Sequence, residues 1–219
     1  MMIENAAHEL LGVILAGGRS QRMGGDDKGL LTLGKKPLIA HVIEKLRPQL
    51  PLLVINANGD PARFAQFALP VVEDRITGYH GPLAGLQAAM RHALDMDEDA
   101  RPTHIVTVAA DTPFFPADLV SRLKEAQREE EADIAMAASG GNLHPVFGLW
   151  PVALEPDLAD WLVSGEKPRV SAWAKRHAVA EVHFDPLKTA DGLTVDPFFN
   201  INTRDDLAQA EELLKKLHS

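Results

Sequence analysis

One stretch of the chain decides its fold, residues 11–28, which read LGVILAGGRSQRMGGDDK. Its apolar beginning predicts a short buried strand, and Gly17 and Gly18 then start a glycine-rich loop. The free backbone N–H groups of such a loop bind phosphate oxygens. Arg22 and Lys28 add full positive charges to the same loop. We therefore expect this stretch to hold the phosphates of a nucleotide.

The spacing excludes two common phosphate-binding loops. A P-loop ends in Gly-Lys-Ser/Thr, whereas Lys28 lies between Asp27 and Gly29. The dinucleotide fingerprint requires an acidic residue about 20 positions after its glycines. Here the second predicted strand ends further along, at Asn56, which is not acidic. The alternative to a nucleotide-binding loop is a surface turn that is rich in glycine and arginine.

The composition limits the classes to which the protein can belong. Its 219 residues, 46% of them hydrophobic, suit one large domain, and no apolar stretch approaches the length of a membrane helix. The N-terminus lacks a secretory pattern. The absence of cysteine excludes disulfides and zinc-thiolate sites and fits a cytoplasmic setting. With a net charge of -9, we expect neither a nucleic acid nor a membrane among the partners.

The order of the expected elements predicts an α/β fold with a mostly parallel sheet and right-handed crossovers, formed by one domain over residues 1–219. In the first half we expect strands at Leu11–Ala16, Leu52–Ile55, Val71–Val72 and His104–Ala109, and helices at Leu38–Leu46, Pro61–Phe67, Leu83–Leu94 and from about Pro116.

The second half is less regular. A hairpin is predicted from strands Ile134–Ala138 and His144–Trp150, which flank the turn residues Gly140, Gly141 and Asn142. Further expected elements are helices at Leu154–Val163 and Val170–Arg176, strands at Val179–Phe184 and Phe198–Ile201, and a helix capped by Thr203 and Asp206.

Asp111 is the sharpest single candidate for chemistry. It follows the apolar run of a strand and precedes Thr112-Pro113. In open α/β sheets, ligands bind beyond the carboxyl ends of the strands. A carboxylate at that place can hold a hard cation that bridges phosphates. The structural alternative is a helix cap or a turn residue.

Polar groups follow the other predicted strands too. Asn56 and Asn58 come after the second strand, Asp74 comes after the third, and Gly81-Pro82-Leu83 starts the next helix. Amides and carboxylates at such positions can recognise base edges and ribose hydroxyls. Each residue alone is typical of a cap or turn, but together they would line one edge of the sheet.

Two further motifs lie in the second half. Asn200 and Asn202 alternate around Ile201, which predicts two amides on one face of a strand. They are candidates for binding a second substrate or for completing a metal site, against the alternative of an edge strand with a turn. His144, followed by Pro145, is a weaker candidate, since a histidine after two glycines is typical of a hairpin.

The motif Leu15-Ala16-Gly17-Gly18-x-Ser20-x-Arg22-Met23-Gly24-x-x-Asp27-Lys28 resembles the signature of the molybdenum cofactor guanylyltransferases. These MobA-type enzymes are nucleotidyltransferases with a Rossmann-like, three-layer α/β/α domain. Further matches in the same order are Lys36-Pro37-Leu38, Asn56-Ala57-Asn58, Glu73-Asp74, Gly81-Pro82-Leu83-Ala84-Gly85, Asp111-Thr112-Pro113, His144-Pro145 and Asn200-Ile201-Asn202-Thr203.

The resemblance implies transfer of GMP from GTP to molybdenum-molybdopterin, with release of pyrophosphate. It implies a nucleotide site made by Leu15, Ala16, Gly17, Gly18, Lys28, Asn56, Asp74, Gly81, Pro82, Leu83 and Asp111, with Mg²⁺ on Asp111. Catalysis is expected from Arg22, Lys28 and Asp111, and acceptor binding from His144, Asn200 and Asn202 in the C-terminal half. Molybdenum-insertion proteins and molybdoenzyme chaperones are the implied protein partners.

Alternatives remain at this stage. Related cytidylyltransferases for the same cofactor carry alanine where this chain has Gly17, which favours guanine by one methyl group. A sugar-1-phosphate nucleotidyltransferase and a non-catalytic GTP-binding module are the other candidates. No general base is expected in the transfer reaction, because a phosphate monoester is already largely ionised at neutral pH. Residues 185–197 match no motif.

Overall fold

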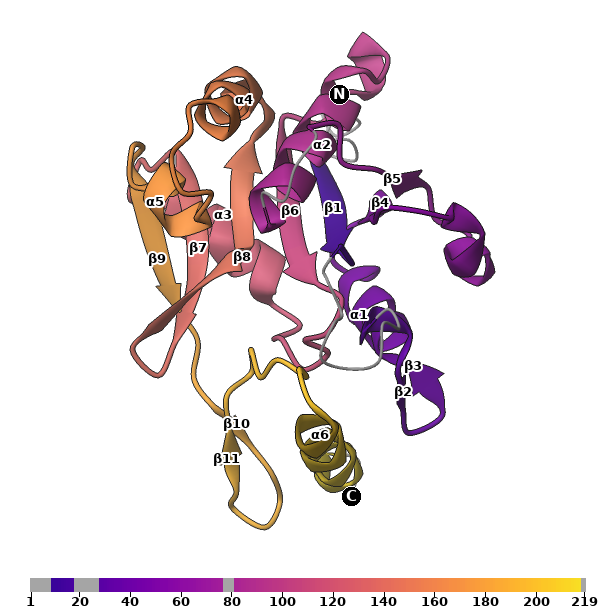
Figure 1. Cartoon of the computed structure of the whole chain (residues 1–219). Coiled ribbons are helices and arrows are strands. Elements are labelled where there is room, and N and C mark those ends of the chain that lie inside the picture. The colour runs from indigo at the N-terminus through magenta and orange to yellow at the C-terminus, as the bar shows by residue number, and fades with distance from the viewer. Residues whose placement is uncertain (1–8, 18–27, 77–80, 218–219) are drawn as a thin grey trace, which may run out of the picture.

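The computed structural model describes residues 9–17, 28–76 and 81–217. Its centre is a seven-stranded sheet with the order β5-β4-β1-β6-β8-β7-β9 (Figure 1). The strands are β1 (Leu10–Leu15), β4 (Leu53–Asn56), β5 (Val71–Val72), β6 (His104–Ala109), β7 (Ile134–Ser139), β8 (Asn142–Pro151) and β9 (Val179–His183). Only β8 runs antiparallel to its two neighbours. The prediction of an α/β fold with a mostly parallel sheet is confirmed.

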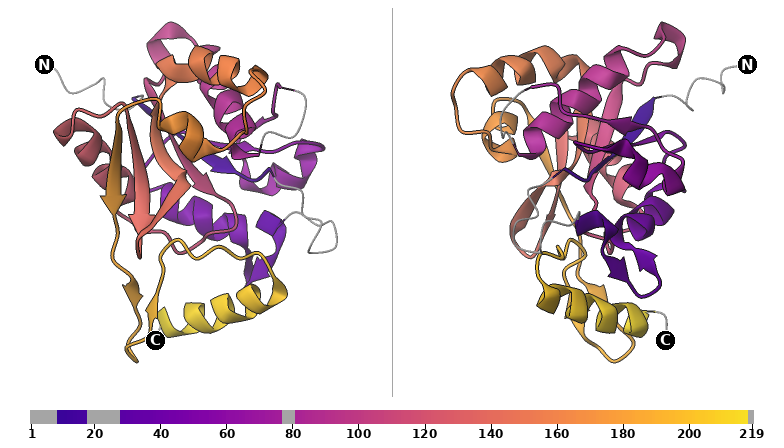
Figure 2. Two further views of the ribbon diagram at one scale, coloured as in Figure 1. Left: turned by 60° about the vertical axis from the view of Figure 1, so that its left-hand side comes forward. Right: turned by 45° about the vertical axis from the view of Figure 1, so that its right-hand side comes forward.

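Helices cover both faces of this sheet (Figures 1 and 2). One hydrophobic cluster joins one face to α1 (Leu38–Leu46) and α3 (Leu119–Glu129). A second cluster joins the other face to α2 (Pro82–Leu94), α4 (Glu155–Val163) and α5 (Val170–Ala174). Short 3₁₀ helices lie at η3 (Lys28–Leu30), η4 (Pro61–Phe67), η5 (Glu98–Ala100) and η6 (Val152–Leu154). The expected three layers are present.

The apolar run of β1 is continuous because both of its faces are covered. Leu10 and Ile14 pack into the cluster with α1, whereas Leu11 and Val13 pack into the cluster with α2. Alternate side chains of a strand point to opposite faces, so a strand inside three layers needs apolar residues at every position. Such burial removes β1 from water along its length and fixes where its glycine-rich end lies.

The predicted hairpin of β7 and β8 is confirmed. Gly140 and Gly141 turn the chain with φ angles of 54° and 79°, a left-handed region that glycine enters without a steric penalty. The pairing shifts register between Met136 and Ala137. β8 then lies between β6 and β7, so this hairpin joins the first half of the chain to the second.

A third hydrophobic cluster lies beyond the carboxyl end of β6. It contains α6 (Arg204–Leu217), the hairpin of β2 (Thr32–Leu33) and β3 (Lys36–Pro37), and the hairpin of β10 (Leu187–Lys188) and β11 (Thr194–Val195). Both hairpins escaped the sequence prediction. Figure 2 shows α6 and the second hairpin at one end of the molecule. Within the described residues, none of the helices has the length and apolar character needed to cross a bilayer.

One predicted strand is wrong. Phe198–Ile201 is irregular, because its backbone groups bond locally and to a strand end rather than to a neighbouring strand. The Phe199 N–H donates to the Asp196 carbonyl at 3.1 Å, and the Ile201 N–H donates to the Asp111 carbonyl at 3.0 Å. The helix expected from Pro116 begins at Leu119. Because Ile201 bonds to Asp111, the segment before α6, residues 196–203, passes the end of β6 (Figure 1).

Candidate active site

The parallel strands bring their carboxyl ends to one edge of the sheet. Leu15 at the end of β1 pairs with Asn56 of β4 and with Ala109 of β6. Beyond the last pairs, the Ala16 N–H donates to the Asn56 carbonyl at 2.8 Å, and the Ala110 N–H donates to the Leu15 carbonyl at 3.0 Å. These bonds hold the start of the glycine-rich loop between the two neighbouring strand ends.

Asn56, Asn58 and Asp74 form one hydrogen-bonded cluster at this edge. Asn56 is 3% exposed, and its Nδ2 donates to the Val72 carbonyl at 3.1 Å and to Asp74 Oδ1 at 2.9 Å. Asn58 Nδ2 donates to Asp74 Oδ2 at 2.7 Å, and its Oδ1 accepts from the Asp74 N–H at 2.9 Å. Both N–H bonds of Asn56 are thereby used, which directs its carbonyl oxygen away from Asp74.

The carbonyl oxygen of Asn56 lies between two glycines. A Cβ atom at Gly85 would come within 2.1 Å of Asn56 Oδ1, a distance that no side chain can occupy. A Cβ atom at Gly17 would lie 3.7 Å from the same oxygen, an ordinary contact. Gly85, in the first turns of α2, is therefore the residue that leaves room for this amide. Gly85 belongs to the motif Gly81-Pro82-Leu83-Ala84-Gly85, but the sequence did not predict that it makes room for Asn56.

Asp111 lies where a residue of the first half of the chain, Lys28, meets the segment of residues 200–202. Burial raises the pKa of the Asp111 carboxyl, and the Lys28 charge and hydrogen bonds from Thr112 and Asn200 act in the opposite direction. Lys28 Nζ donates to Asn202 Oδ1 at 2.6 Å. Ile201, which lies between the two asparagines, donates its N–H to the Asp111 carbonyl and so holds both of them near the end of β6. The structure thus brings Lys28, Asp111, Asn200 and Asn202 together.

His144 belongs to a separate polar group on the β7–β8 hairpin. Its Nε2 lies 2.6 Å from Ser139 Oγ, which donates to Asp196 Oδ1 at 2.7 Å. Its ring stacks on Phe198 with centroids 4.5 Å apart. Ser139 and Asp196 were missed by sequence reasoning. Asp196 lies in the stretch that matched no motif, and Ser139 is an ordinary strand residue.

The remaining candidates differ in what they can offer a ligand. Gly18 and Arg22 lie outside the described residues. Gly81 precedes α2 with a φ of 59°, and Pro82 is the first residue of the helix. Leu83 is fully buried among core residues, so its side chain serves the packing of α2 and not a contact with a ligand. Ala16 and Leu15 are partly exposed at the end of β1.

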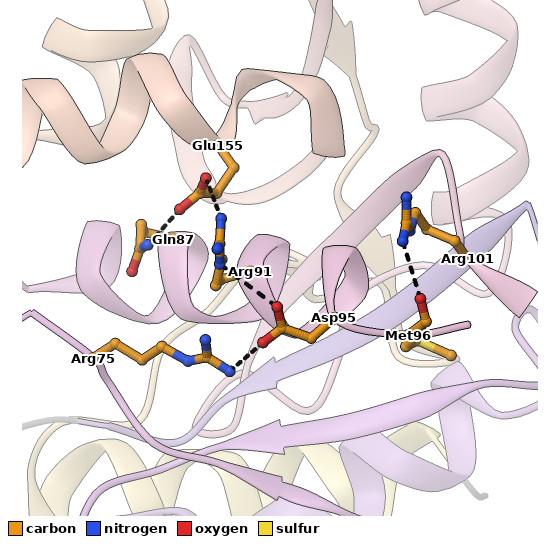
Figure 3. Close-up of polar contacts among 7 residues, drawn as sticks. All are labelled: Arg75, Gln87, Arg91, Asp95, Met96, Arg101 and Glu155. Atoms are coloured by element: carbon orange, nitrogen blue, oxygen red, sulfur yellow. Dashed lines mark hydrogen bonds and ion pairs between the residues drawn. The ribbon is translucent and has the colours of Figure 1, made fainter. Parts of the chain in front are cut away.

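A chain of charged and amide groups supports the strand end that carries Asp74 (Figure 3). Arg75 donates to Asp95 Oδ2 at 2.6 Å, and Arg91 lies 3.6 Å from both Asp95 Oδ1 and Glu155 Oε2. Gln87 Nε2 donates to the buried Glu155 at 2.6 Å. These side-chain contacts connect the loop after β5 to α2 and α4. Its exposed members contribute little stability, whereas Glu155 has a buried charge to satisfy.

No cluster of three or more histidine, aspartate or glutamate side chains suited to a metal occurs in the parts of the chain that are described. Among the residues that are described, Asp111 offers its carboxylate at the strand end with the amides of Asn200 and Asn202 nearby. Such a donor set is incomplete for a metal held by protein alone. It resembles the sites of Mg²⁺, which usually keeps water and binds one or two carboxylates plus substrate phosphates.

Comparison with known proteins agrees with this geometry. The family model of the MobA-like NTP transferase domain matches residues 12–181. A molybdenum cofactor guanylyltransferase of Rhizobium leguminosarum is 50% identical over 211 residues, which cover 96% of each chain. A protein of the same name from a Bradyrhizobium species is 48% identical over 204 residues, covering 92% of each chain.

Solved structures share the fold. Molybdopterin-guanine dinucleotide biosynthesis protein A from Archaeoglobus fulgidus has a TM-score of 0.69 at 24% identity and covers 94% of this chain and 99% of its own. The 4-diphosphocytidyl-2C-methyl-D-erythritol synthase of Anaerococcus prevotii has a TM-score of 0.69 at 13% identity, covering 94% and 96%. The chain therefore belongs to the MobA-like nucleotidyltransferases, in the group whose members are named molybdenum cofactor guanylyltransferases.

Proposed function

We propose that the protein transfers GMP from GTP to molybdenum-molybdopterin, yielding the guanine dinucleotide form of the cofactor and pyrophosphate. The observation that carries this proposal is the meeting of Lys28 and Asp111 with Asn200 and Asn202 at the end of β6. Groups suited to a triphosphate thereby lie beside amides suited to a second substrate. The names of relatives that are about half identical supply the substrates.

On the nucleotide side, we assign guanine and ribose recognition to the Asn56–Asn58–Asp74 cluster. Its hydrogen bonds orient each amide before a ligand arrives, which lowers the entropic cost of binding. The N–H groups of the glycine-rich loop from Gly17 onward, and that of Gly81, would contact phosphates or the base, since the Ala16 N–H is already bonded to the Asn56 carbonyl. Gly17 does not open space for Asn56, because an alanine there would make only an ordinary contact. Base choice therefore needs a direct test.

The residues support a charge-neutralising mechanism without a general base. The attacking group is a terminal phosphate oxygen of molybdopterin, already largely ionised at neutral pH. Asp111 would hold Mg²⁺, which neutralises phosphate charge when it is bound. Lys28 and Arg22 would place further positive charge against the phosphates, and Asn202 orients Lys28 through a 2.6 Å hydrogen bond. His144, Asn200 and Asn202 would bind and orient the acceptor.

The same proposal includes the setting of the reaction. We treat residues 1–219 as one domain, whose N-terminal half binds the nucleotide and whose C-terminal half binds the acceptor. The lack of cysteine suits a cytoplasmic enzyme, and its acceptor would arrive from molybdenum-insertion proteins and its product pass to molybdoenzyme chaperones.

A nucleotide panel tests the proposal. Purified protein is incubated with Mg²⁺, molybdenum-molybdopterin and GTP, CTP, ATP or UTP, and pyrophosphate is measured with and without the acceptor. Acceptor-dependent release from GTP alone is expected. Release from CTP would identify a cytidylyltransferase. In a parallel panel with sugar 1-phosphates as acceptors, release only there would identify a sugar-1-phosphate nucleotidyltransferase. Binding of GTP without any release would identify a binding module.

Loss of the carboxylate at position 111 provides the matching residue test. Asp111→Asn keeps the shape but removes the charge, so the rate of GMP transfer should fall by about 10²–10³. Lys28→Ala should cause a loss of similar size for the same reason. Asp118→Asn and Lys35→Ala are the matched controls, since both side chains are exposed nearby on the chain. Full activity of either site variant would remove that residue from the mechanism.

A further inference from the structure

The segment that carries the acceptor amides has no secondary structure to hold it. Residues 196–202 lie between β11 and α6 without a strand or helix. Asn200 and Asn202 nevertheless need defined places, since they contact Asp111 and Lys28. An irregular segment keeps one conformation only where side chains or backbone groups fix it from outside. The groups that fix this segment therefore decide whether the two amides reach the site.

Ser139, the last residue of β7, is a group that fixes this segment. Ser139 is 2% exposed, and its Oγ lies 2.6 Å from His144 Nε2 and 2.7 Å from Asp196 Oδ1. The same carboxylate oxygen accepts the Phe198 N–H at 2.9 Å. One serine hydroxyl thus joins the β7–β8 hairpin to the first residue of the irregular segment.

The proton count of these groups leaves one arrangement. Asp196 as a carboxylate can only accept, so the single hydroxyl proton of Ser139 goes to it. His144 Nε2 must then carry a proton and donate to Ser139 Oγ. Burial lowers the pKa of His144, which favours the neutral ring, and the tautomer follows from the hydrogen bonds alone. The serine hydroxyl is committed to the carboxylate, so the three residues are an anchor and not a nucleophilic triad.

Aromatic packing strengthens the same anchor. Phe198 is 4% exposed and stacks on the His144 ring at 4.5 Å and 28°. It also meets Phe147 at 4.8 Å and Phe184 at 5.5 Å between ring centroids. The irregular segment is therefore held by a polar contact at Asp196 and an apolar contact at Phe198, and Asn200 lies two residues beyond Phe198.

We propose that Ser139 and Asp196 are positioning residues for the acceptor substrate: they hold residues 196–202 so that Asn200 and Asn202 face Asp111 and Lys28. The inference rests on the proposed function, because it names the acceptor as the phosphate-bearing molybdopterin. The nucleotide cluster of Asn56, Asn58 and Asp74 lies on the other strand ends and does not depend on this anchor.

Kinetics with separated substrates test the proposal. In Ser139→Ala and Asp196→Ala, kcat/KM for molybdopterin should fall by about tenfold or more, the usual effect of losing a hydrogen bond to a charged group. The dissociation constant of GTP, measured directly, should change several-fold less than kcat/KM for molybdopterin, because the Asn56–Asn58–Asp74 cluster stays intact and only the Asn202 contact of Lys28 is loosened. Asp196→Asn keeps an accepting oxygen and should restore most of the activity. The double variant should be no worse than Asp196→Ala, because that substitution already removes the contact with Ser139 together with the bond from the Phe198 N–H.

Thr107→Val is the matched control. It removes a buried hydroxyl of β6 that donates to the Val146 carbonyl of β8 at 2.6 Å and accepts from Trp150 Nε1 at 2.8 Å, and neither bond includes Ser139, His144 or Asp196. Its cost in stability should not change kcat/KM for molybdopterin. Equal losses for GTP and molybdopterin, equal losses in Thr107→Val, or unchanged kinetics in Ser139→Ala and Asp196→Ala would each overturn the proposal.

Amide hydrogen exchange provides a readout that needs no substrate. The Ile201 N–H, bonded to the Asp111 carbonyl, should exchange faster in Ser139→Ala and Asp196→Ala but not in Thr107→Val. Faster exchange in a protein whose wild type transfers no GMP would reject the proposed function and retain the anchor. Unchanged exchange in variants of an active enzyme would reject the anchor and retain the function.

Discussion

At the scale of single residues, the site depends as much on missing side chains as on present ones. The amide of Asn56 reaches Asp74 only because position 85, in the first turns of α2, has no Cβ atom. A methyl group there would meet Asn56 Oδ1 at 2.1 Å and Leu15 Cδ2 at 3.0 Å. Neither neighbour can retreat easily, since Asn56 is bonded at both N–H groups and Leu15 belongs to β1.

Gly85→Ala should therefore weaken nucleotide binding. We expect a loss of stability of about 1–3 kcal/mol from overpacking and a rise of about tenfold or more in the KM for GTP, because Asn56 must leave Asp74. Gly12→Ala is the control, since its methyl group would press on Leu53 at the other end of β1. Steady-state kinetics and urea unfolding of both variants check this, and an unchanged KM in Gly85→Ala would refute it.

Glu155 provides a second test at the residue scale (Figure 3). It is 5% exposed and accepts from Gln87 at 2.6 Å, with Arg91 at 3.6 Å. Glu155→Ala should cost about 1–3 kcal/mol, because the buried amide of Gln87 would lose its partner. Glu155→Gln keeps an accepting oxygen and should cost less, and Glu166→Ala, at an exposed position, should cost almost nothing. Urea unfolding measures all three, and equal costs for Ala and Gln would contradict the role of the hydrogen bond.

At the scale of elements, the start of α6 is fixed by a capping box. The Asp206 N–H donates to Thr203 Oγ1 at 3.1 Å, and Asp206 Oδ2 accepts the Thr203 and Asn202 N–H groups at 2.8 and 2.9 Å. Backbone bonds of Asp206 to Asn202 contribute most to lowering the pKa of the Asp206 carboxyl. The cap therefore orders the residue that holds Lys28 as well as the helix.

Thr203→Ala should lower the free energy of unfolding by about 1 kcal/mol, since it leaves one N–H group of the first turn without its side-chain partner. Thr203→Ser retains the hydroxyl and should lie near wild type. Hydrogen exchange at the start of α6 should accelerate only in the alanine variant. If serine and alanine behave alike, the hydroxyl does not stabilise the helix.

The elements also show what the sequence could predict. Long apolar runs such as that of β6 and the turn glycines 140 and 141 give signals that need no distant partner, so the sheet and its hairpin were predicted. The strands of β2–β3 and β10–β11 have two residues each, and each contains a lysine or a threonine, so they lack the apolar pair that marks the equally short β5. The apolar residues Phe198 and Ile201 led to the wrong prediction of a strand, whereas in the structure each packs into a different hydrophobic cluster.

The candidate site also contains residues that the sequence predicts and residues that it does not. Asn56, Asp74 and Asp111 could be found because every parallel strand delivers its next residues to one edge. The bond from Ser139 to Asp196 joins residues 57 positions apart, and neither residue type is unusual where it stands. Contacts of that kind follow from the packed structure and leave no local pattern.

At the scale of the whole molecule, three partly buried histidines link stability to pH. Burial lowers the pKa of His92, His104 and His144 from the usual 6.5. The unfolded chain then binds more protons than the folded chain below about pH 6.5, so the free energy of unfolding should decrease as the pH falls from 7.5 to 5.5. Each histidine contributes at most about 1.4 kcal/mol per pH unit.

Urea unfolding at several pH values measures this slope. His104→Gln should flatten it, and any difference from wild type at pH 8 gives the cost of the substitution itself, since the unfolded histidine is then neutral. A free energy that stays constant or rises as the pH falls from 7.5 to 5.5 would show that these histidines charge equally well in both states.

The third hydrophobic cluster affects how the chain must be made. Leu33, Leu38 and Phe114 come early in the sequence, yet Ile201, Ala210 and Leu213 cover them. A ribosome releases the nucleotide-binding strands long before α6 can dock, so a nascent chain presents bare apolar surface next to an unfinished pocket. Premature stop codons or bulky fusions that hinder α6 should therefore yield insoluble, chaperone-bound protein instead of a GTP-binding fragment.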